Sequence, residues 1–96
     1  MSGYFYILSN KSNKVLYKGS TADLIKRIYE HKNHLDKGSF TDKYNVTKLV
    51  YYEVYESIQE ARGREVQVSK WSRDKKDKLI DSLNPEREDL YWDIVG

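Results

Sequence analysis

The chain has 96 residues, a formal net charge of +2 at pH 7 and no cysteine. That length supports one compact domain with a modest core and leaves no room for two, so we expect residues 1–96 to form a single domain. Without cysteine the chain can hold no disulfide framework, thiolate metal site or thiol nucleophile. No apolar run approaches the ~20 residues that span a bilayer, and the N-terminus lacks a signal-peptide pattern. We therefore expect a cytoplasmic protein without membrane contact.

The first half of the chain predicts a β-hairpin followed by a helix and a loop. The alternating runs GYFYILS (3–9) and KVLYKG (14–19) predict two strands with a turn between them. Ser20 with Asp23 three residues later forms a variant of the capping box, which predicts a helix from there to about Asn33. The polar stretch DKGSFTDKYN that follows predicts a loop.

The second half predicts one strand and two helices. KLVYYEVYE (48–56) is typical of a third strand, and Ser57 with Glu60 forms a capping box that opens a helix through about Arg73. Asp74 is expected to cap a short helix through Leu83. Asn84-Pro85 ends that helix, and the apolar segment EDLYWDIV is expected to pack back on the core. The order ββαβαα predicts a small α/β (α+β) domain with a three-stranded antiparallel sheet flanked by helices.

The charge is unevenly distributed along the chain. Residues 1–50 contain nine Lys/Arg and four Asp/Glu, whereas residues 51–96 contain eight and eleven, so the halves carry +5 and −3. A basic half suits a polyanion such as DNA, but so small a net charge neutralises few phosphates. Binding to DNA should therefore be weak and strongly salt-dependent. The expected contact surface consists of the lysines of the basic half: Lys11, Lys14, Lys18, Lys26 and Lys32.

Three polar residues fall on helix faces that should turn toward the core. On a helical wheel of the first helix, Arg27 and His31 lie within or at the edge of the apolar stripe. On a wheel of the second helix, Glu65 lies in the middle of the apolar stripe. An arginine can extend from a stripe edge to water, and a lone inward histidine is more often a hydrogen-bonded core residue than a ligand. A buried carboxylate needs a partner or a metal, and Arg27 is one candidate partner for Glu65.

An arginine, a histidine, a glutamate and strand tyrosines on one sheet face suit hydrolysis of a phosphodiester with one divalent metal. Arginine is a forked donor for phosphate, and glutamate is a hard oxygen ligand for Mg²⁺. A tyrosine hydroxyl can act as a general acid or base when neighbouring cations lower its pKa. Acyl transfer is not indicated, because no serine is paired with a base and there is no thiol.

The combined spacing of these residues resembles the GIY-YIG nuclease superfamily over nearly the whole chain. The resemblance points to small stand-alone bacterial members, which are related to the N-terminal nuclease domain of a bacterial excinuclease and to homing endonucleases. The matching residues are Tyr4-Phe5-Tyr6, Tyr17-Lys18-Gly19, Ser20-Thr21, Asp23-Leu24, Arg27, His31, ARGRE (61–65), KW (70–71), LI (79–80), NPE and DLY.

The resemblance implies a divalent-metal-dependent endonuclease that hydrolyses phosphodiester bonds in DNA, in repair or recombination. It implies that Tyr6 and Tyr17 line the site and that one of the two tyrosines helps to deprotonate the attacking water. The resemblance does not say which tyrosine has this role. Arg27 would neutralise charge that develops in the transition state, and His31 would assist proton transfer or contact the phosphate. Glu65 would bind the single Mg²⁺ or Mn²⁺.

Further positions are expected to contact substrate. Gly19 matches the family glycine, where the missing side chain would let the strand end approach the phosphate. Lys18 replaces an apolar family residue and would either face solvent or reach a phosphate. Lys26 belongs to the expected basic surface, and Asn84 corresponds to a family asparagine near the site.

Two other interpretations of the sequence stay open. The same fold could serve as a non-catalytic nucleic-acid-binding or protein-interaction module, which the low charge and the lack of a second DNA-binding domain favour. A protein partner could then supply DNA affinity. In a third interpretation the protein is purely structural, and Arg27 and Glu65 form a buried ion pair. The sequence does not determine an oligomeric state.

Overall fold

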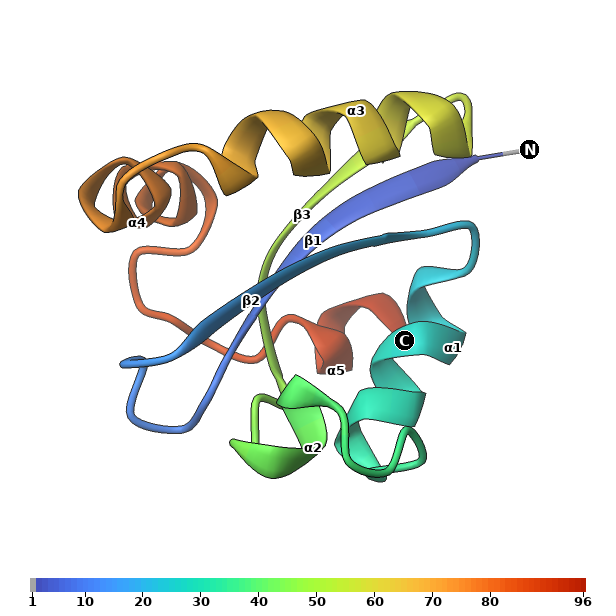
Figure 1. The fold of residues 1–96 in the computed structure, drawn as a ribbon, viewed down its shortest axis with the longest axis vertical. Helices are drawn as coiled ribbons and strands as arrows, with labels where there is room; N and C mark the ends of the chain where they lie inside the picture. Colours follow the sequence, from blue (N-terminus) through green and yellow to red (C-terminus); the bar gives the residue numbers. More distant parts are fainter. Residues whose placement is uncertain (1) are drawn as a thin grey trace.

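The computed structural model describes residues 2–96 and contains one antiparallel sheet. Its strands are β1 (Gly3–Ser9), β2 (Leu16–Thr21) and β3 (Lys48–Tyr55), in the order β2-β1-β3 (Figure 1). The predicted three-stranded antiparallel sheet is confirmed, and β1 has its predicted bounds. Because β1 is central, β2 and β3 are the two edges of the sheet.

The helices of the structure outnumber those that the sequence predicts. They are α1 (Leu24–Lys32), α2 (Phe40–Lys43), α3 (Ile58–Ser69), α4 (Arg73–Leu83) and α5 (Tyr91–Ile94). The order is therefore ββααβααα rather than ββαβαα. The short helices α2 and α5 account for the difference: α2 lies in the predicted loop, and α5 lies in the apolar C-terminal segment that packs on the core as predicted.

Two predicted helix starts are wrong. Ser20 does not cap α1, because it still pairs with Phe5 as part of β2; the cap is Asp23, whose side chain accepts from the Lys26 N–H. The second predicted helix ends at Ser69 instead of continuing, and Ser72 rather than Asp74 caps α4. In contrast, Ser57 caps α3 as predicted. In both wrong cases more than one residue had suitable capping chemistry; strand pairing excludes Ser20, and α4 begins one residue after Ser72.

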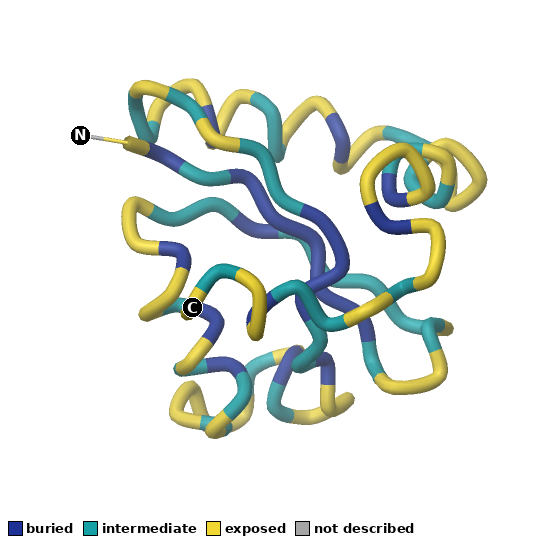
Figure 2. The backbone as a smooth tube through the Cα atoms, turned by 180° about the vertical axis from the view of Figure 1, so that it is seen from behind, coloured by how far each residue is buried: buried dark blue, intermediate teal, exposed yellow. Residues whose placement is uncertain are grey.

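The side-chain alternation of β1 divides the core into two parts. Tyr6 and Leu8 pack on the side of α1 and α5, whereas Phe5 and Ile7 pack on the side of α3 and α4. Figure 1 shows these helices on opposite faces of the sheet, and Figure 2 shows β1 as the most continuously buried segment. Every residue of β1 therefore matters to one face or the other.

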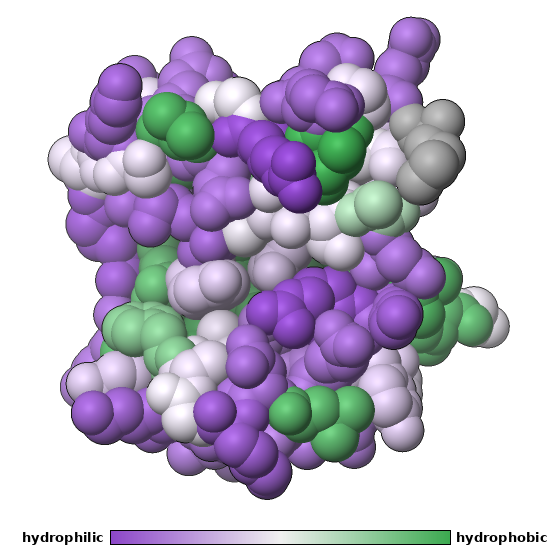
Figure 3. Space-filling model, turned by 45° about the vertical axis from the view of Figure 1, so that its right-hand side comes forward, coloured by the Kyte–Doolittle hydropathy of each residue, from purple (hydrophilic) through white to green (hydrophobic). Residues whose placement is uncertain are grey.

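The face of the molecule that Figure 3 shows is predominantly hydrophilic. On the face that Figure 3 shows, the hydrophobic side chains form separate patches among hydrophilic ones. Within residues 2–96 no helix is long and apolar enough to cross a bilayer.

A polar cluster joins α3 to β3 on the second face. Glu53 accepts hydrogen bonds from the hydroxyls of Tyr51 and Tyr55, each at 2.5 Å, and from two guanidinium nitrogens of Arg64 at 3.0 and 3.1 Å. The guanidinium also lies 4.9 Å from the ring centre of Trp71. Because Arg64 directly precedes Glu65 on α3, this cluster sets where Glu65 lies relative to the sheet.

Replacing the carboxylate of this cluster should weaken the fold. We expect Glu53→Gln to lower the free energy of unfolding by ~2–3 kcal/mol, because hydrogen bonds to a charged acceptor become bonds to a neutral one. Urea denaturation measures the change. Glu86→Gln, at an exposed position, is the control and should stay within ~0.5 kcal/mol of wild type. Equal midpoints for both variants would contradict the anchoring role.

Candidate active site

Two tyrosines and a histidine meet on the α1 face of the sheet. Tyr6 from β1, Tyr17 from β2 and His31 from α1 have ring centres 5.7 to 6.5 Å apart. The Tyr6 hydroxyl lies 3.1 Å from Nε2 of His31, and both side chains are almost completely buried. Tyr17 is half-buried and stacks on Phe40 of α2. The structure thus brings together three of the five predicted catalytic residues by direct contact.

The ring of Tyr6 ends above Gly19 of the neighbouring strand. The two residues are paired in the sheet, and a Cβ at Gly19 would lie 2.4 Å from the Tyr6 hydroxyl oxygen. Non-bonded carbon and oxygen atoms do not approach each other so closely, and the Tyr6 ring cannot move away because it is buried in the core. The glycine is therefore required by the packing of Tyr6, a reason that differs from the expected approach of a phosphate.

Arg27 extends from α1 beside this group into a shallow depression. Its Nη1 donates to Glu30 at 3.2 Å and its Nη2 to Asp36 at 3.4 Å. These three residues and Leu35 line the depression, and the Arg27 side chain remains 29% exposed. Partly exposed pairs of this kind contribute little to stability, so the guanidinium can exchange its partners for a phosphate.

Burial governs the electrostatics of the site. Burial raises the pKa of Tyr6 well above its usual range, and the nearby Tyr17 and Glu65 raise it further. Arg27 acts in the opposite direction and lowers the pKa of Tyr6. Burial also lowers the pKa of His31 to about 4; Arg27 lowers it too, and Asp36 and Glu30 oppose the change. At neutral pH the site therefore holds a neutral phenol hydrogen-bonded to a neutral imidazole.

Glu65 lies on the other side of edge strand β2. Its Oε1 accepts a hydrogen bond of 2.7 Å from Ser20, whose side chain points to the opposite face of the sheet from the Tyr6 ring that covers Gly19. Glu65 is half-buried rather than enclosed in apolar contacts, and within residues 2–96 no cation pairs with it. The alternative interpretation of a buried Arg27–Glu65 ion pair is wrong, because the sheet separates the two side chains.

The structure does not bring the remaining predicted residues to this group. Lys18 lies on the opposite face from Tyr17 and lines a small cleft with Lys76 of α4. Lys26 is exposed on α1. Asn84 is buried, and its amide bonds the backbone of Val50 on β3, the far edge of the sheet, and of Glu88. Its role in this structure is to cap α4 and hold the C-terminal segment.

Sequence reasoning missed three residues that touch the site. Ser20 holds Glu65, Phe40 stacks on Tyr17, and Thr41 contacts His31. Strand alternation past Gly19 could have found Ser20. The spacing of Ser39 and Asp42, which is that of a helix cap, could have indicated α2.

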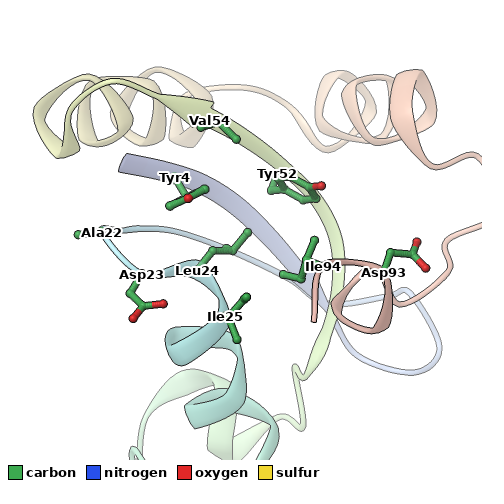
Figure 4. Close-up of a pocket in the computed structure, with 9 residues that line it drawn as sticks. All are labelled: Tyr4, Ala22, Asp23, Leu24, Ile25, Tyr52, Val54, Asp93 and Ile94. Atoms are coloured by element: carbon green, nitrogen blue, oxygen red, sulfur yellow. The ribbon is translucent and has the colours of Figure 1, made fainter. Parts of the chain in front are cut away.

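A larger concavity than the depression at Arg27 lies elsewhere on the α1 face. Figure 4 shows Leu24 and Ile25 of α1 and Ile94 of α5 pointing toward Tyr4 of β1 and Tyr52 of β3. The carboxylates of Asp23 and Asp93 stand at its rim and point away from it (Figure 4). With an apolar floor and no converging acid, base or cation, this cavity offers no chemistry of its own.

Residues 2–78 match a family model described as the GIY-YIG catalytic domain. The chain belongs to the GIY-YIG family. It is 39% identical over 84 residues to a UPF0213 protein of Syntrophus aciditrophicus, covering 88% of this chain and 94% of the relative. A UPF0213 protein of Clostridium perfringens is 38% identical over 91 residues, covering 95% and 96%.

The fold of the GIY-YIG family is confirmed by a solved relative. A UPF0213 protein of Bacillus halodurans, determined by NMR in solution, superposes with a TM-score of 0.58 at 30% identity, covering 94% of each chain. GIY-YIG domains are generally endonucleases that use a divalent metal, which agrees with the chemistry of the residues gathered around β2. The names of these UPF0213 relatives state no activity.

The buried His31 should make stability depend on pH. Its pKa is about 4 in the folded protein and ~6.5 in the unfolded chain, so the unfolded chain takes up the proton first as the pH falls. We expect its contribution, up to ~3 kcal/mol, to be complete above pH 6.5 and to be lost on acidification toward pH 4.

Urea denaturation at a series of pH values, comparing wild type with His31→Gln, isolates this contribution from that of the carboxylates. An NMR titration of the His31 ring then gives its pKa directly. A midpoint between pH 6 and 7 would contradict the burial argument.

Proposed function

We propose that this protein is a divalent-metal-dependent endonuclease that hydrolyses phosphodiester bonds in DNA. One observation carries the proposal: the hydrogen-bonded pair Tyr6–His31 and the carboxylate of Glu65 approach edge strand β2 from opposite faces at consecutive residues, Gly19 and Ser20. β2 is an edge strand, so no further strand covers its outer side, and Ser20 and Glu65 are partly exposed there. A long polymer can lie along such an edge, whereas a closed pocket would exclude it.

The side chains have complementary tasks in this proposal. The Tyr6 oxygen accepts a proton from the attacking water while its own proton moves to Nε2 of His31, 3.1 Å away. Tyr6 is favoured over Tyr17 as the acceptor of the water proton, because it is Tyr6 that bonds the imidazole. Arg27 exchanges its exposed carboxylate partners for a phosphate oxygen and stabilises the charge that develops there.

Glu65 is the candidate ligand of the metal. Mg²⁺ is commonly held by one or two protein carboxylates together with water and substrate phosphate oxygens, and a half-exposed glutamate at a strand edge suits that mode. No group of three or more His, Cys, Asp or Glu side chains within residues 2–96 could hold a metal alone. Bound Mg²⁺ or Mn²⁺ would polarise the phosphate and stabilise negative charge on oxygen. Ser20 orients the carboxylate through its hydrogen bond.

The fold changes which lysines form the basic surface that would contact DNA. Lys32, expected to contribute, instead pairs with Asp89 and lies over the rings of Tyr91 and Trp92. Lys18 and Lys76, which belongs to the acidic half of the chain, line the same cleft beside β2. This pair continues the edge of β2 away from Glu65 and offers two charges to a phosphate backbone.

One observation favours the second candidate, a non-catalytic nucleic-acid-binding or protein-interaction module. Arg27 already holds Glu30 and Asp36, so a phosphate must compete with two carboxylates for it. In this case a partner protein would supply DNA affinity or recruit the domain. Binding without metal-dependent cleavage would identify the module.

Cleavage tests the endonuclease proposal directly. Labelled duplex, single-stranded, flap and junction DNAs are incubated with the protein in Mg²⁺, Mn²⁺ or EDTA, and we expect cutting only with metal. Glu65→Gln should lose at least ~10²-fold in rate and lose any metal-induced rise in melting temperature, while remaining as stable as wild type in EDTA, because no cation depends on the carboxylate. Glu86→Gln is the control. A fully active Glu65→Gln would remove this residue from the mechanism.

The salt dependence of DNA binding tests this changed basic surface. Lys76→Gln should weaken binding to duplex DNA and reduce the slope of log K against log salt by about 1, because one phosphate contact is lost. Lys78→Gln is a matched control on the same helix, where the lysine is 76% exposed and pairs with Asp74. Equal slopes for the two variants would place the DNA elsewhere.

A further inference from the structure

A chain of hydrogen bonds runs from the site toward the surface. Beyond the contact of Tyr6 with Nε2, the other ring nitrogen of His31, Nδ1, lies 2.8 Å from the Thr41 hydroxyl. That hydroxyl lies 3.2 Å from the hydroxyl of Ser39. Tyr6, His31 and Thr41 are each at most 2% exposed, whereas Ser39 is half-buried. The chain therefore leads from a buried phenol to a group that water can reach.

The hydroxyl of Thr41 can serve either tautomer of the imidazole. If Nδ1 carries the proton, it donates to Thr41, Thr41 donates to Ser39, and Nε2 is free to accept from Tyr6. If Nε2 carries the proton, it donates to Tyr6, and Thr41 turns to donate to Nδ1. In both arrangements each ring nitrogen, and the oxygen of each of these hydroxyls, keeps a hydrogen-bond partner.

His31 lacks the partner that usually stabilises a charged imidazole. Within residues 2–96 both ring nitrogens bond hydroxyls, and no carboxylate bonds either one. The ionisable groups around the ring are Tyr6, Tyr17, Arg27, Glu30 and Asp36, of which Arg27 opposes a positive charge on it. A proton that arrives at Nε2 is therefore better passed on through Nδ1 than stored.

We propose that Thr41 is a positioning residue that makes His31 a two-way proton relay between Tyr6 and solvent through Ser39. This purpose rests on the proposed nuclease function. In the forward step the Tyr6 proton bonds to Nε2 as the Nδ1 proton leaves to Thr41. Thr41 releases its own proton to Ser39, and Ser39 releases one to water. Tyr6 regains a proton from the attacking water, and the imidazole stays neutral throughout.

The reverse sequence restores the starting state. After product release a proton from solvent enters through Ser39 and Thr41 to Nδ1. The Nε2 proton returns to the Tyr6 oxygen as Tyr6 releases its own proton to a water molecule that has replaced the product. The short helix α2 holds the two hydroxyls for this task, because Ser39 also accepts the Asp42 N–H and caps the helix. The segment predicted as a plain loop thus supplies the outer half of the relay.

Nitrogen NMR of the imidazoles tests the relay without relying on cleavage. The chain has two histidines, so His34 serves as an internal reference in every spectrum. We expect the Nδ1–H tautomer of His31 to be populated in wild type, because its proton has an acceptor. Thr41→Val keeps the shape and removes the hydroxyl, so His31 should convert to the Nε2–H tautomer. Thr41→Ser should restore the wild-type spectrum, and Thr47→Val, a matched change of a half-buried threonine, should leave it unchanged.

Kinetics on the same variants connect the relay to catalysis. Thr41→Val should lower kcat by ~10²-fold with KM for DNA unchanged, and Thr41→Ser should recover most of the loss. Melting temperatures establish that each variant is folded. The proposal is overturned if wild-type His31 holds only the Nε2–H tautomer, or if a folded Thr41→Val keeps the wild-type tautomer. Failure of wild type to cleave DNA would refute the proposed function and leave the tautomer measurements to decide the relay.

Discussion

The contact of the Tyr6 ring with the backbone at Gly19 is the constraint on which the rest of the site depends. Tyr6 is a core residue of the central strand, yet its hydroxyl reaches the neighbouring edge strand only because Gly19 has no side chain. There the hydroxyl meets His31, and the imidazole in turn contacts Thr41. Moving the Tyr6 ring by the width of one methyl group would break the hydrogen bond between Tyr6 and His31, the first of these contacts.

Burial of this phenol and imidazole has a chemical consequence. Both groups are desolvated and neutral, so neither supplies a standing charge at neutral pH. The charges of the site come instead from Arg27 and Glu65, which are partly exposed and lie on opposite sides of β2. In the proposed function, a neutral phenol and imidazole between a cation and an anion suit a substrate that brings its own negative charge, and the arrangement avoids burying an ion pair.

Much of this arrangement could be predicted from the sequence. Alternation predicts the three strands, and within β2 it puts Tyr17 and Gly19 on one face of the sheet. The register of the hairpin, which pairs Tyr6 with Gly19, is what brings Tyr6 to that same face. The inward position of His31 follows in the same way from helical periodicity. Both are local consequences of backbone geometry, which is why they needed no knowledge of the fold.

Tertiary structure decided which partners these side chains have. Glu65 and Arg27 both looked buried on their own helices, but the sheet between α1 and α3 keeps them apart and gives Glu65 to Ser20. Asn84 has the chemistry of a ligand and is used as a helix cap.

The α2 segment shows the limit of sequence reasoning most clearly. Its polar composition predicts a loop, and the Ser39–Asp42 cap spacing is the one local sign of a helix. Packing against α1 and β2 holds the four-residue helix in place and turns Thr41 toward His31. So short a helix has almost no intrinsic stability, because nucleation costs more than its few hydrogen bonds return. The sequence by itself determined the strands, the long helices and the inward residues, since each follows from a local period. The edge-strand site and its path to solvent were decided by contacts between distant segments, which no local pattern encodes.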